Sequence, residues 1–414
     1  MSNLPKGWES VELGSVCKIN GRIGFRGYTV NDLVERNQGG AITLSPSNII
    51  GNKLDLSKCT YISDFKYEES PEIKIFNGDI ILVKTASIGK TALVENLLEK
   101  ATLNPQLVVL KDIKINNVFL SYIISSLIIQ KQIKQTSGGG VLQTLSQKQI
   151  AKYIFPLPPL EEQKKIADIL STVDKKIAFV EENINATEEL KKALMQKLLT
   201  EGIGHTEFKD SELGRIPESW GVVKLEDCII GKGQYGINAA AVDFSENLPR
   251  YLRITDIDDS GKFIKENSKS VDTIEIDTFS LNENDIVFAR TGNTTGKTYL
   301  YDKKDGELIF AGFLIRFTPN QDILDSRYLK LYTETSDYWK WVKVMSTRTG
   351  QPGINSNEYG KLPFKFPPLE EQKQIAEILS TVDKKIENLK EKKESFEELK
   401  KGLMQKLLTG EVRV

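Results

Sequence analysis

The sequence has 414 residues, of which 27% are charged, and its basic and acidic side chains nearly cancel to a net charge of −1. This length predicts two or three domains. We find no signal peptide and no apolar run of about 18 residues, so we expect no membrane span, and cysteines without a disulfide framework fit a reducing cytoplasm. Three widely spaced cysteines, Cys17, Cys59 and Cys228, form no ligand or disulfide pattern, and a single histidine, His205, excludes a histidine-rich zinc site.

Residues 1–158 predict a first domain that is rich in β-sheet. Apolar runs bounded by Gly, Asn, Asp and Ser predict strands at Ile73–Phe76, Asp79–Lys84 and Leu107–Leu110. Residues 118–134 predict one helix that closes the domain. Residues 1–160 carry 18 basic and 13 acidic side chains, a net charge of +5. This is the sign expected of a domain that binds nucleic acid.

Residues 159–204 predict a long helix. Pro159 precedes Glu161 and Glu162, whose charges favour the positive end of a helix dipole. Apolar residues then recur in alternating steps of four and three, the pattern of a coiled-coil seam, with a slip near Thr187. A helix from about 161 to 200 would be roughly 60 Å long. The predicted seam comprises Ile166, Leu170, Val173, Ile177, Val180, Ile184, Leu190, Leu194 and Leu198.

Residues 205–367 predict a second domain of the same kind, which begins after a glycine-rich linker that includes His205. Strands are expected at Tyr251–Ile254, Asp285–Ala289 and Phe313–Phe317, and one helix at residues 326–344. Residues 205–368 carry 21 basic and 25 acidic side chains, a net charge of −4. If this domain binds nucleic acid, its basic side chains must therefore cluster on one part of its surface.

Residues 368–414 repeat the first helix almost literally. Pro159–Ile177 returns as Pro368–Ile386 with two of 19 positions changed, and Leu190–Thr200 returns as Leu399–Thr409 with one change. The offset is 209 residues in both stretches, so the two helices have equal lengths, whereas the preceding domains repeat only loosely. The predicted seam of this copy comprises Ile375, Leu379, Val382, Ile386, Leu389, Phe396, Leu399, Leu403 and Leu407.

These elements predict a mixed α/β (α+β) fold made of two tandem domains, each followed by a long helix. An apolar seam of such length needs a partner, and the other copy is the obvious one. A pseudo-two-fold relation of the copies would make the helices an antiparallel coiled coil and bring Val414 back near Met1. The alternative is that each amphipathic helix lies on its own domain.

Several residue patterns resemble one known family. They are the two copies of Pro-Pro-Leu-Glu-Glu-Gln at 158–163 and 367–372, the Leu-Met-Gln-Lys-Leu-Leu-Thr that ends each helix, and a tryptophan, Trp8 or Trp220, near each domain start. A strand that ends in Lys84-Thr85 or Arg290-Thr291 also fits. Over essentially its whole length the chain resembles the specificity subunits of type I restriction-modification systems.

The resemblance implies a DNA-binding subunit without catalytic activity of its own. Each domain would be a target recognition domain that reads one half of a split sequence in double-stranded DNA. The paired helices would fix the spacing and dock two methyltransferase subunits, and restriction subunits would join that core. S-adenosylmethionine, ATP and magnesium would then be bound by the partner subunits rather than by this chain.

Candidate DNA-binding residues follow from the loops of the aligned segments, because bases are read by Arg, Lys, Asn and Gln and phosphates are held by basic and hydroxyl side chains. In the first domain the candidates are Arg22, Arg26, Lys84, Thr85, Lys90 and Gln143. In the second domain they are Lys232, Gln234, Tyr235, Arg290, Thr291, Asn293, Lys297, Arg348 and Gln351. For each of them the alternative is an ordinary hydrated loop residue.

Two motifs resemble catalytic sites but lack a feature that such sites require or a counterpart in the other copy. Gly292–Thr298 resembles a phosphate-binding loop, but it has three residues between its glycines where four are needed. Asp64 with Glu72 and Lys74 loosely resembles the acidic cluster of a metal-dependent nuclease, but nothing comparable occupies the matching part of the second copy.

Two other functional classes remain open at this point. A coiled-coil adaptor whose domains bind proteins is favoured slightly by the net charge of −4 on the second domain. A stand-alone nuclease would cleave DNA by itself when magnesium is present. Salt dependence distinguishes the adaptor, because DNA affinity falls steeply with ionic strength.

Overall fold

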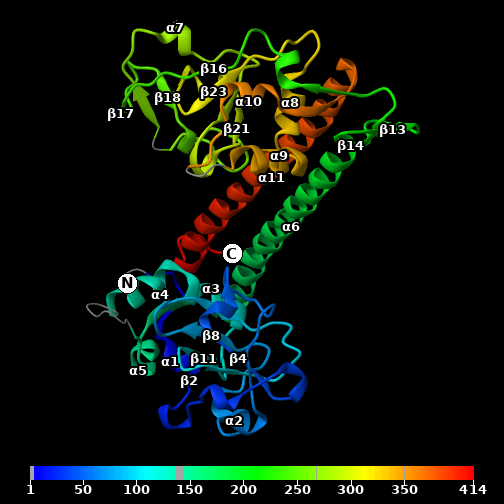
Figure 1. Cartoon of the computed structure of the whole chain (residues 1–414). Helices are drawn as coiled ribbons and strands as arrows, with labels where there is room; N and C mark the ends of the chain where they lie inside the picture. Colours follow the sequence, from blue (N-terminus) through cyan, green and yellow to red (C-terminus); the bar gives the residue numbers. More distant parts are fainter. Residues whose placement is uncertain (1–3, 137–143, 267, 348–350) are drawn as a thin grey trace. The chain divides into compact units, whose positions relative to one another are not determined.

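The computed structural model describes residues 4–136, 144–266, 268–347 and 351–414. It divides into two compact units (Figure 1). Unit 1 comprises Met1–Glu181 and Glu391–Val414, and unit 2 comprises Glu182–Lys390. Each unit contains one mixed α/β domain together with parts of two long helices, α6 (Leu160–Leu198) and α11 (Leu369–Thr409). The predicted fold class is therefore confirmed.

The first domain is built mainly from short strands and short helices. Its strands are β1 (Glu9–Glu12), β2 (Lys18–Gly21), β3 (Leu33–Val34), β4 (Ala41–Leu44), β5 (Ile49–Ile50), β6 (Lys53–Leu54), β7 (Tyr61–Ile62), β8 (Ile80–Val83), β9 (Thr91–Leu93), β10 (Ala101–Leu103), β11 (Leu107–Lys111) and β12 (Ile154–Leu157). Its helices are α1 (Leu13–Val16), α2 (Asp64–Glu68), α3 (Asn117–Ser125), α4 (Leu127–Thr136) and α5 (Gln147–Ala151).

The second domain uses the same kinds of element after a β-hairpin in the connecting segment. Its strands are β13 (Phe208–Ser211), β14 (Gly214–Pro217), β15 (Gly221–Lys224), β16 (Gln234–Tyr235), β17 (Ala241–Asp243), β18 (Arg250–Leu252), β19 (Lys269–Val271), β20 (Ile286–Ala289), β21 (Thr298–Leu300), β22 (Leu308–Phe310), β23 (Leu314–Phe317) and β24 (Pro363–Phe366). Its helices are α7 (Ile276–Phe279), α8 (Ser326–Tyr332), α9 (Ser336–Ser346) and α10 (Ser356–Gly360).

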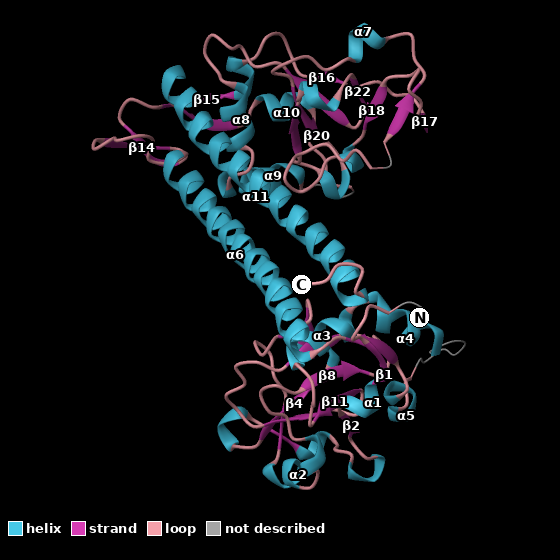
Figure 2. Ribbon diagram, turned by 180° about the vertical axis from the view of Figure 1, so that it is seen from behind, coloured by secondary structure: helices cyan, strands magenta, loops and turns pink. Residues whose placement is uncertain are grey.

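The two domains share one sheet topology. Figure 2 shows the strands of each domain in magenta. The antiparallel sheet β2-β11-β8-β9 of the first domain corresponds to β16-β23-β20-β21 of the second. The sheet β10-β4-β7-β3 corresponds to β22-β18-β19-β17, and in both of them only the first pair is parallel. A two-stranded ladder, β1-β12 or β15-β24, joins the start of each domain to the strand that precedes its long helix. The loose sequence repeat therefore conceals a close structural one.

The strands at the centre of each domain consist of continuous apolar residues because both of their faces are covered. All four residues of β8 and all four of β20 are buried. Alternate residues of these strands contribute to two different apolar clusters, such as Ile80 and Ile81 in the first domain. A strand buried on both faces loses the alternation of apolar and polar residues that marks a half-exposed strand.

The structure corrects three of the local predictions. Residues 118–134 form two helices, because Ser126 ends α3 and its hydroxyl then accepts a hydrogen bond from the Ile128 amide at the start of α4. Residues 326–344 likewise form α8 and α9, and Thr335 caps the second of them. The strand predicted at Ile73–Phe76 is absent, since it contains the end of a 3₁₀ turn and one isolated β-bridge at Ile75.

The long helices pack against each other in antiparallel fashion within each unit. In unit 1, Lys400 pairs with Asp174 at 2.6 Å and Lys393 pairs with Glu181 at 2.9 Å. As the residue number falls on α11 it rises on α6, which defines the antiparallel direction. In unit 2, Lys191 of α6 pairs with Asp383 of α11 at 2.8 Å. Lys191 and Asp383 are the repeat counterparts of Lys400 and Asp174, so one ion pair is made twice with the helices exchanged.

Burial tests the predicted seam residue by residue. Buried members are Ile166, Leu170, Val173, Val180, Ile184, Leu198, Ile375, Leu379, Ile386 and Leu407, and half-buried members are Ile177, Leu194, Val382, Leu389, Phe396 and Leu403. Leu190 and Leu399 contradict the prediction, because each is 49% exposed. The seam follows a regular alternation through Thr187 and Lys191 instead, so the predicted slip does not occur and polar residues occupy two of its positions.

The first turns of each long helix pack on the domain that precedes them. Ile166 and Leu170 belong to the main apolar cluster of the first domain, together with Leu407 and Leu408 from the end of α11. Ile375 and Leu379 have the same place in the second domain, beside Leu198 and Leu199. The alternative in which a helix lies on its own domain therefore holds for these turns only. Among the described residues, none of the helices combines the length and the hydropathy that a membrane span requires.

Candidate nucleic-acid interface

The glutamate-rich motif at the start of each long helix joins a domain to its helix. In unit 1 the Glu162 carboxylate, 6% exposed, accepts hydrogen bonds from the Trp8 indole at 3.1 Å and from the Arg413 guanidinium at 2.8 and 3.1 Å. The hydrogen bonds from Arg413 are the main reason that the pKa of Glu162 lies below its ordinary value. Arg413 also donates to the Lys6 carbonyl, so the C-terminal residues are attached near the start of the first domain; Met1, which was predicted to lie near Val414, is outside the described residues.

The same joint recurs in unit 2. Glu371 accepts from the Trp220 indole at 2.9 Å and from the Ile203 amide at 2.9 Å, and its other contact is with Nε2 of His205 at 2.8 Å. His205 therefore lies in the connecting segment, as predicted, but it is a packed part of this joint. The connecting segment in unit 2 has the role that the C-terminal residues have in unit 1.

The glutamine that follows each glutamate completes the joint. The Gln163 side chain accepts from the Asn116 amide and donates to the Pro158 carbonyl, at 2.9 and 2.8 Å. Gln372 accepts from the Asp325 amide and donates to the Pro367 carbonyl, both at 2.9 Å. These contacts explain the motif that carries the family resemblance, and they assign it to structural attachment rather than to DNA binding.

The loop that follows the central strand of each domain is held in one backbone frame. In the first domain the Lys84 amide donates to Gln106, the Leu145 amide donates to Lys84, and Thr85 forms a β-bridge with Thr144. The lengths of the two hydrogen bonds are both 2.8 Å. We call residues 84–90 together with 144–145 the first loop frame.

The second domain repeats each of these contacts. The Arg290 amide donates to Phe313 at 3.0 Å, the Ile354 amide donates to Arg290 at 2.9 Å, and Thr291 bridges Gly353. We call residues 290–297 together with 353–354 the second loop frame. Lys84 and Arg290 therefore occupy the same backbone position but present different side chains. This is the arrangement expected of two domains that perform one task on different targets.

The structure brings five of the predicted residues of the second domain together at its loop frame. The Arg290 guanidinium stacks on the Tyr235 ring, with 4.8 Å from its carbon to the ring centroid. Thr291 and the exposed Asn293 lie on the same loop, and the side-chain nitrogen of the exposed Gln351 lies close to Gly292. The Tyr235 hydroxyl accepts from the Ser356 amide at 3.0 Å, which fixes the ring.

The other predicted residues of this domain do not join this group of side chains. Lys297 ends the same loop, but its amine pairs with Asp259 at 2.7 Å, and the Gln234 side chain is engaged by the Arg316 guanidinium. Lys232 is exposed and lies outside the loop frame. Arg348 lies outside the described residues.

In the first domain Lys84, Thr85 and the exposed Lys90 belong to the loop frame, whereas the two arginines do not. Arg22 is 5% exposed, and its guanidinium donates to the Leu103 and Arg26 carbonyls and to the Thr102 hydroxyl. Its burial lowers the pKa of Arg22, and the bonds it makes support a structural role instead of contact with DNA. Arg26 contacts Glu72 at 3.4 Å. Gln143 lies outside the described residues.

Sequence reasoning missed two residues at the loop frames. Phe313 supplies the carbonyl that fixes Arg290, and its own ring is 58% exposed. Gln106 has the corresponding place beside Lys84. The available signal was position, because Phe313 and Gln106 each directly precede the strand that pairs with the central strand of their domain.

The two motifs that resemble catalytic sites are accounted for by ordinary contacts. Gly292–Thr298 leads into strand β21 rather than into a helix, so the dipole that a phosphate-binding loop uses is missing at this place. Asp64 and Glu72 have different cationic partners, Lys100 and Arg26, and Lys74 pairs with Glu68. Within the part of the chain that the structure describes, no group of three acidic, histidine or cysteine side chains could hold a metal ion.

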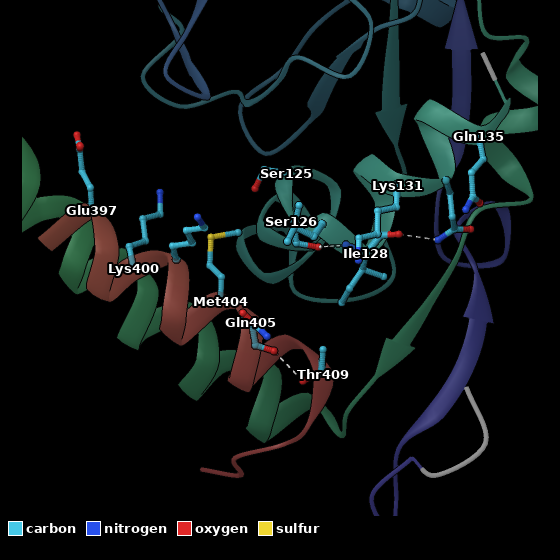
Figure 3. A pocket seen from close by; sticks show the side chains of 13 residues that line it. Ser125, Ser126, Ile128, Lys131, Gln135, Glu397, Lys400, Met404, Gln405 and Thr409 are labelled. Atoms are coloured by element: carbon cyan, nitrogen blue, oxygen red, sulfur yellow. Dashed lines mark hydrogen bonds between the residues drawn. The ribbon is translucent and has the colours of Figure 1, made fainter. Parts of the chain in front are cut away.

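A groove with a volume of about 740 Å³ lies between α4 and the end of α11 in unit 1 (Figure 3). Leu127, Ile128 and Met404 contribute apolar atoms, and Lys131 and Lys401 line it as well. Figure 3 shows Met404 on α11 directed toward α4. The groove therefore leaves apolar atoms of a long helix accessible within the first unit.

Comparison with known proteins identifies the family. The family of type I restriction modification DNA specificity domains matches residues 5–189 and 217–398, one segment for each copy of the repeat. The chain belongs to this family. A type I DNA specificity domain is thus present twice, and each copy ends within its long helix.

Several relatives of this specificity-domain protein match along nearly the whole chain. The MjaVIII specificity subunit of the archaeon Methanocaldococcus jannaschii is 29% identical, over 99% of this chain and 94% of its own length. The StySPI specificity subunit of Salmonella potsdam is 22% identical, over 93% and 85%. The crystal structure of the type I S subunit from M. genitalium has a TM-score of 0.58 and 14% identity, over 99% and 97%. That structure supports the fold alone.

Proposed function

We propose that this chain is the specificity subunit of a type I restriction-modification complex and that each domain reads one half of a bipartite DNA site. The observation that carries the proposal is the pair of loop frames, in which the same backbone contacts present Lys84 in one domain and Arg290 in the other. Different side chains on one frame suit the reading of two different half-sites. The named relatives, which are all specificity subunits, support the same function.

The proposed partners are double-stranded DNA, two methyltransferase subunits and restriction subunits. Leu190 and Leu399 support two copies of one partner, since they occupy corresponding positions of the repeat and each is 49% exposed. An identical partner would find the same accessible leucine once in each unit. S-adenosylmethionine, ATP and magnesium would be bound by these partners, and the assembly would act in the cytoplasm. In this proposal the chain supplies recognition, and the partners supply the chemistry.

We also propose that the long helices set the distance between the two half-sites. Seven residues added to each helix, one seam repeat, would lengthen it by about 10 Å at 1.5 Å per residue. Because stacked base pairs rise by about 3.4 Å, the unread gap would grow by roughly three base pairs. Mapping of the methylated sequence for this variant measures the gap, and an unchanged gap would contradict this role of the helices.

The proposed function is tested by mapping methylated bases in a host that expresses this chain with its methyltransferase subunit. The expected result is a split, asymmetric motif that disappears when this chain is deleted. If the subunits copurify and no such motif appears, the protein-binding adaptor becomes the better explanation. DNA binding that falls steeply between about 50 and 200 mM salt would argue against that adaptor.

A further inference from the structure

The second loop frame combines a cation, two aromatic rings and two amides on one accessible surface. Arg290 directly follows β20, Tyr235 is 40% exposed at the edge of the same sheet, and Phe313, 58% exposed, directly precedes the neighbouring strand β23. Asn293 and Gln351 are exposed beside them. This set contains the residue types that recognise base edges, because arginine pairs with guanine, asparagine and glutamine pair with adenine, and apolar rings contact the thymine methyl group.

Arg290 is prepared for a planar, two-pronged contact. Its guanidinium lies on the Tyr235 ring, and the ring is itself fixed by the Ser356 amide. Such stacking orients the guanidinium without using its donors. Among the described residues, the Arg290 guanidinium donates one side-chain hydrogen bond, to the Gly312 carbonyl, and it is long at 3.5 Å. Most of its donors therefore stay available.

The charge of Arg290 has no carboxylate partner among the described residues. In the described part of unit 2, ion pairs link Arg253, Arg316 and Arg327 each to an aspartate, whereas Arg290 shares with Arg215 and Arg250 the absence of such a pair. Of these three arginines, only Arg290 lies at the loop frame. In a domain with a net charge of −4, a cation on the surface without an acidic partner marks a place where a negative or acceptor-rich ligand would be bound.

The first domain has different side chains at the corresponding positions. Lys84 stands where Arg290 stands, and Gln106 stands where Phe313 stands, as their backbone hydrogen bonds show. Gly21 pairs with Val108 in the position that Tyr235 has opposite Ile315. The stacked arginine is therefore a property of the second domain, although the frame is common to both.

We propose that Arg290, held on Tyr235, selects a guanine in the half-site that the second domain reads. The inference rests on the proposed function and names the chemistry of one position within it. Arginine can donate two parallel hydrogen bonds to O6 and N7 of guanine, and no other base offers both acceptors on its major-groove edge. Tyr235 is a positioning residue in this arrangement, since it acts on the base through Arg290.

The experiment uses the complex of this chain with its methyltransferase subunits. The methylated motif of the wild-type complex is mapped first, and binding is then measured by competition with duplexes that carry each substitution of the second half-site. For Arg290→Ala, we expect the preference for one G·C pair to fall by roughly 10- to 100-fold, with the other half-site read unchanged. Arg290→Gln should shift the same position toward adenine. Tyr235→Ala should weaken selection at that position and add little to Arg290→Ala.

Two controls make the outcome specific. Arg215 also stacks on an aromatic ring, Phe208, at 4.8 Å, but it lies on the β13–β14 hairpin away from the loop frame. Arg215→Ala should leave the motif unchanged. Lys84→Ala should affect only the half-site that Arg290→Ala leaves intact, which assigns the half-sites to their domains.

The proposal is overturned if Arg290→Ala weakens binding equally for all sequences, since that is the behaviour of a phosphate contact. It is also overturned if the affected half-site contains no G·C pair or if Arg290 and Lys84 affect the same half-site. If neither Arg290→Ala nor Arg290→Gln forms the complex with the methyltransferase subunits, the residue has a structural role and the proposal is overturned. A wild-type complex without any bipartite motif would instead refute the proposed function itself.

Discussion

Replacing the glutamate of a joint should destabilise the unit that contains it. Glu371→Ala removes the acceptor of the Trp220 indole, and that tryptophan is 1% exposed, so its N–H group loses its protein partner in a nearly closed site. A buried donor left without an acceptor costs about 1–3 kcal/mol. In a unit of about 200 residues, a loss of 2 kcal/mol lowers the melting temperature by about 4–8 °C. Differential scanning calorimetry of the full-length chain measures this shift.

The sequence supplies its own control at the preceding position. Glu370 is the other glutamate of the same motif, and its side chain is 80% exposed and contacts only Lys373 among the described ion pairs. Both residues lie in the first turn of α11, so loss of a negative charge near the helix start is common to the two variants. Glu370→Ala should therefore change the melting temperature little.

If Glu371→Ala melts within about 1 °C of Glu370→Ala, the buried hydrogen bond to Trp220 does not stabilise the unit. Trp220→Phe tests the same hydrogen bond from the donor side, because it keeps most of the packed ring and removes the N–H group. It should cost less than Glu371→Ala, since Glu371 would retain its contacts with Ile203 and His205.

Three further outcomes are expected. Lys365 is 3% exposed, burial lowers the pKa of its amine, and its carboxylate partner, Asp337, is 3.7 Å away. Lys365→Met should therefore leave the free energy of unfolding unchanged or raise it. A decrease of more than about 1 kcal/mol, measured by calorimetry, would contradict this. The pKa of Glu162 is lowered in the folded chain, so its contribution is present above its ordinary pKa of 4.5 and is lost as the pH falls through the folded value. Between about pH 5 and 3, the free energy of unfolding of Glu162→Gln should therefore fall less than that of the wild type in denaturant titrations. Equal decreases would show that the ionised Glu162 carboxylate does not stabilise the joint. Cys59 is half-buried, whereas burial raises the pKa of the Cys17 thiol to about 12, so iodoacetamide at pH 8 should label Cys59 first; equal labelling by mass spectrometry would show that Cys17 is accessible.

The sequence predicted most of the architecture because its strongest signals are long. A 19-residue repeat and a seam over some forty residues leave little freedom in where the helices begin and how they pair. The exposure of Leu190 could not be seen in the same way. A rule that assigns apolar residues to the seam prefers Leu190 to Thr187 and Lys191, but the helix keeps its regular alternation and accepts the polar residues, one of which pairs with Asp383.

The candidate interface was predictable as a place but not as a set of contacts. The aligned strand ends located the loop frames, because a strand followed by a polar loop recurs at 84–90 and 290–297. Arg22 shows why residue type alone was insufficient, since a buried guanidinium can satisfy backbone carbonyls as readily as bases. The stacking of Arg290 on Tyr235 depends on the pairing of strands that are some 80 residues apart, which no local pattern reveals.

The joints have a consequence for how such genes can change. The contacts that attach each domain are made by a tryptophan near its start and by a Glu-Gln pair after its last strand, and both copies use the same residues. A crossover between two genes at the codons of the first Glu-Gln pair would replace everything that follows it, the second domain included, and two crossovers, one at each pair, would replace the second domain alone. In either case the residues that attach the incoming domain are ones that the receiving chain already uses. Such an exchange would change a whole domain without requiring the joints to adapt.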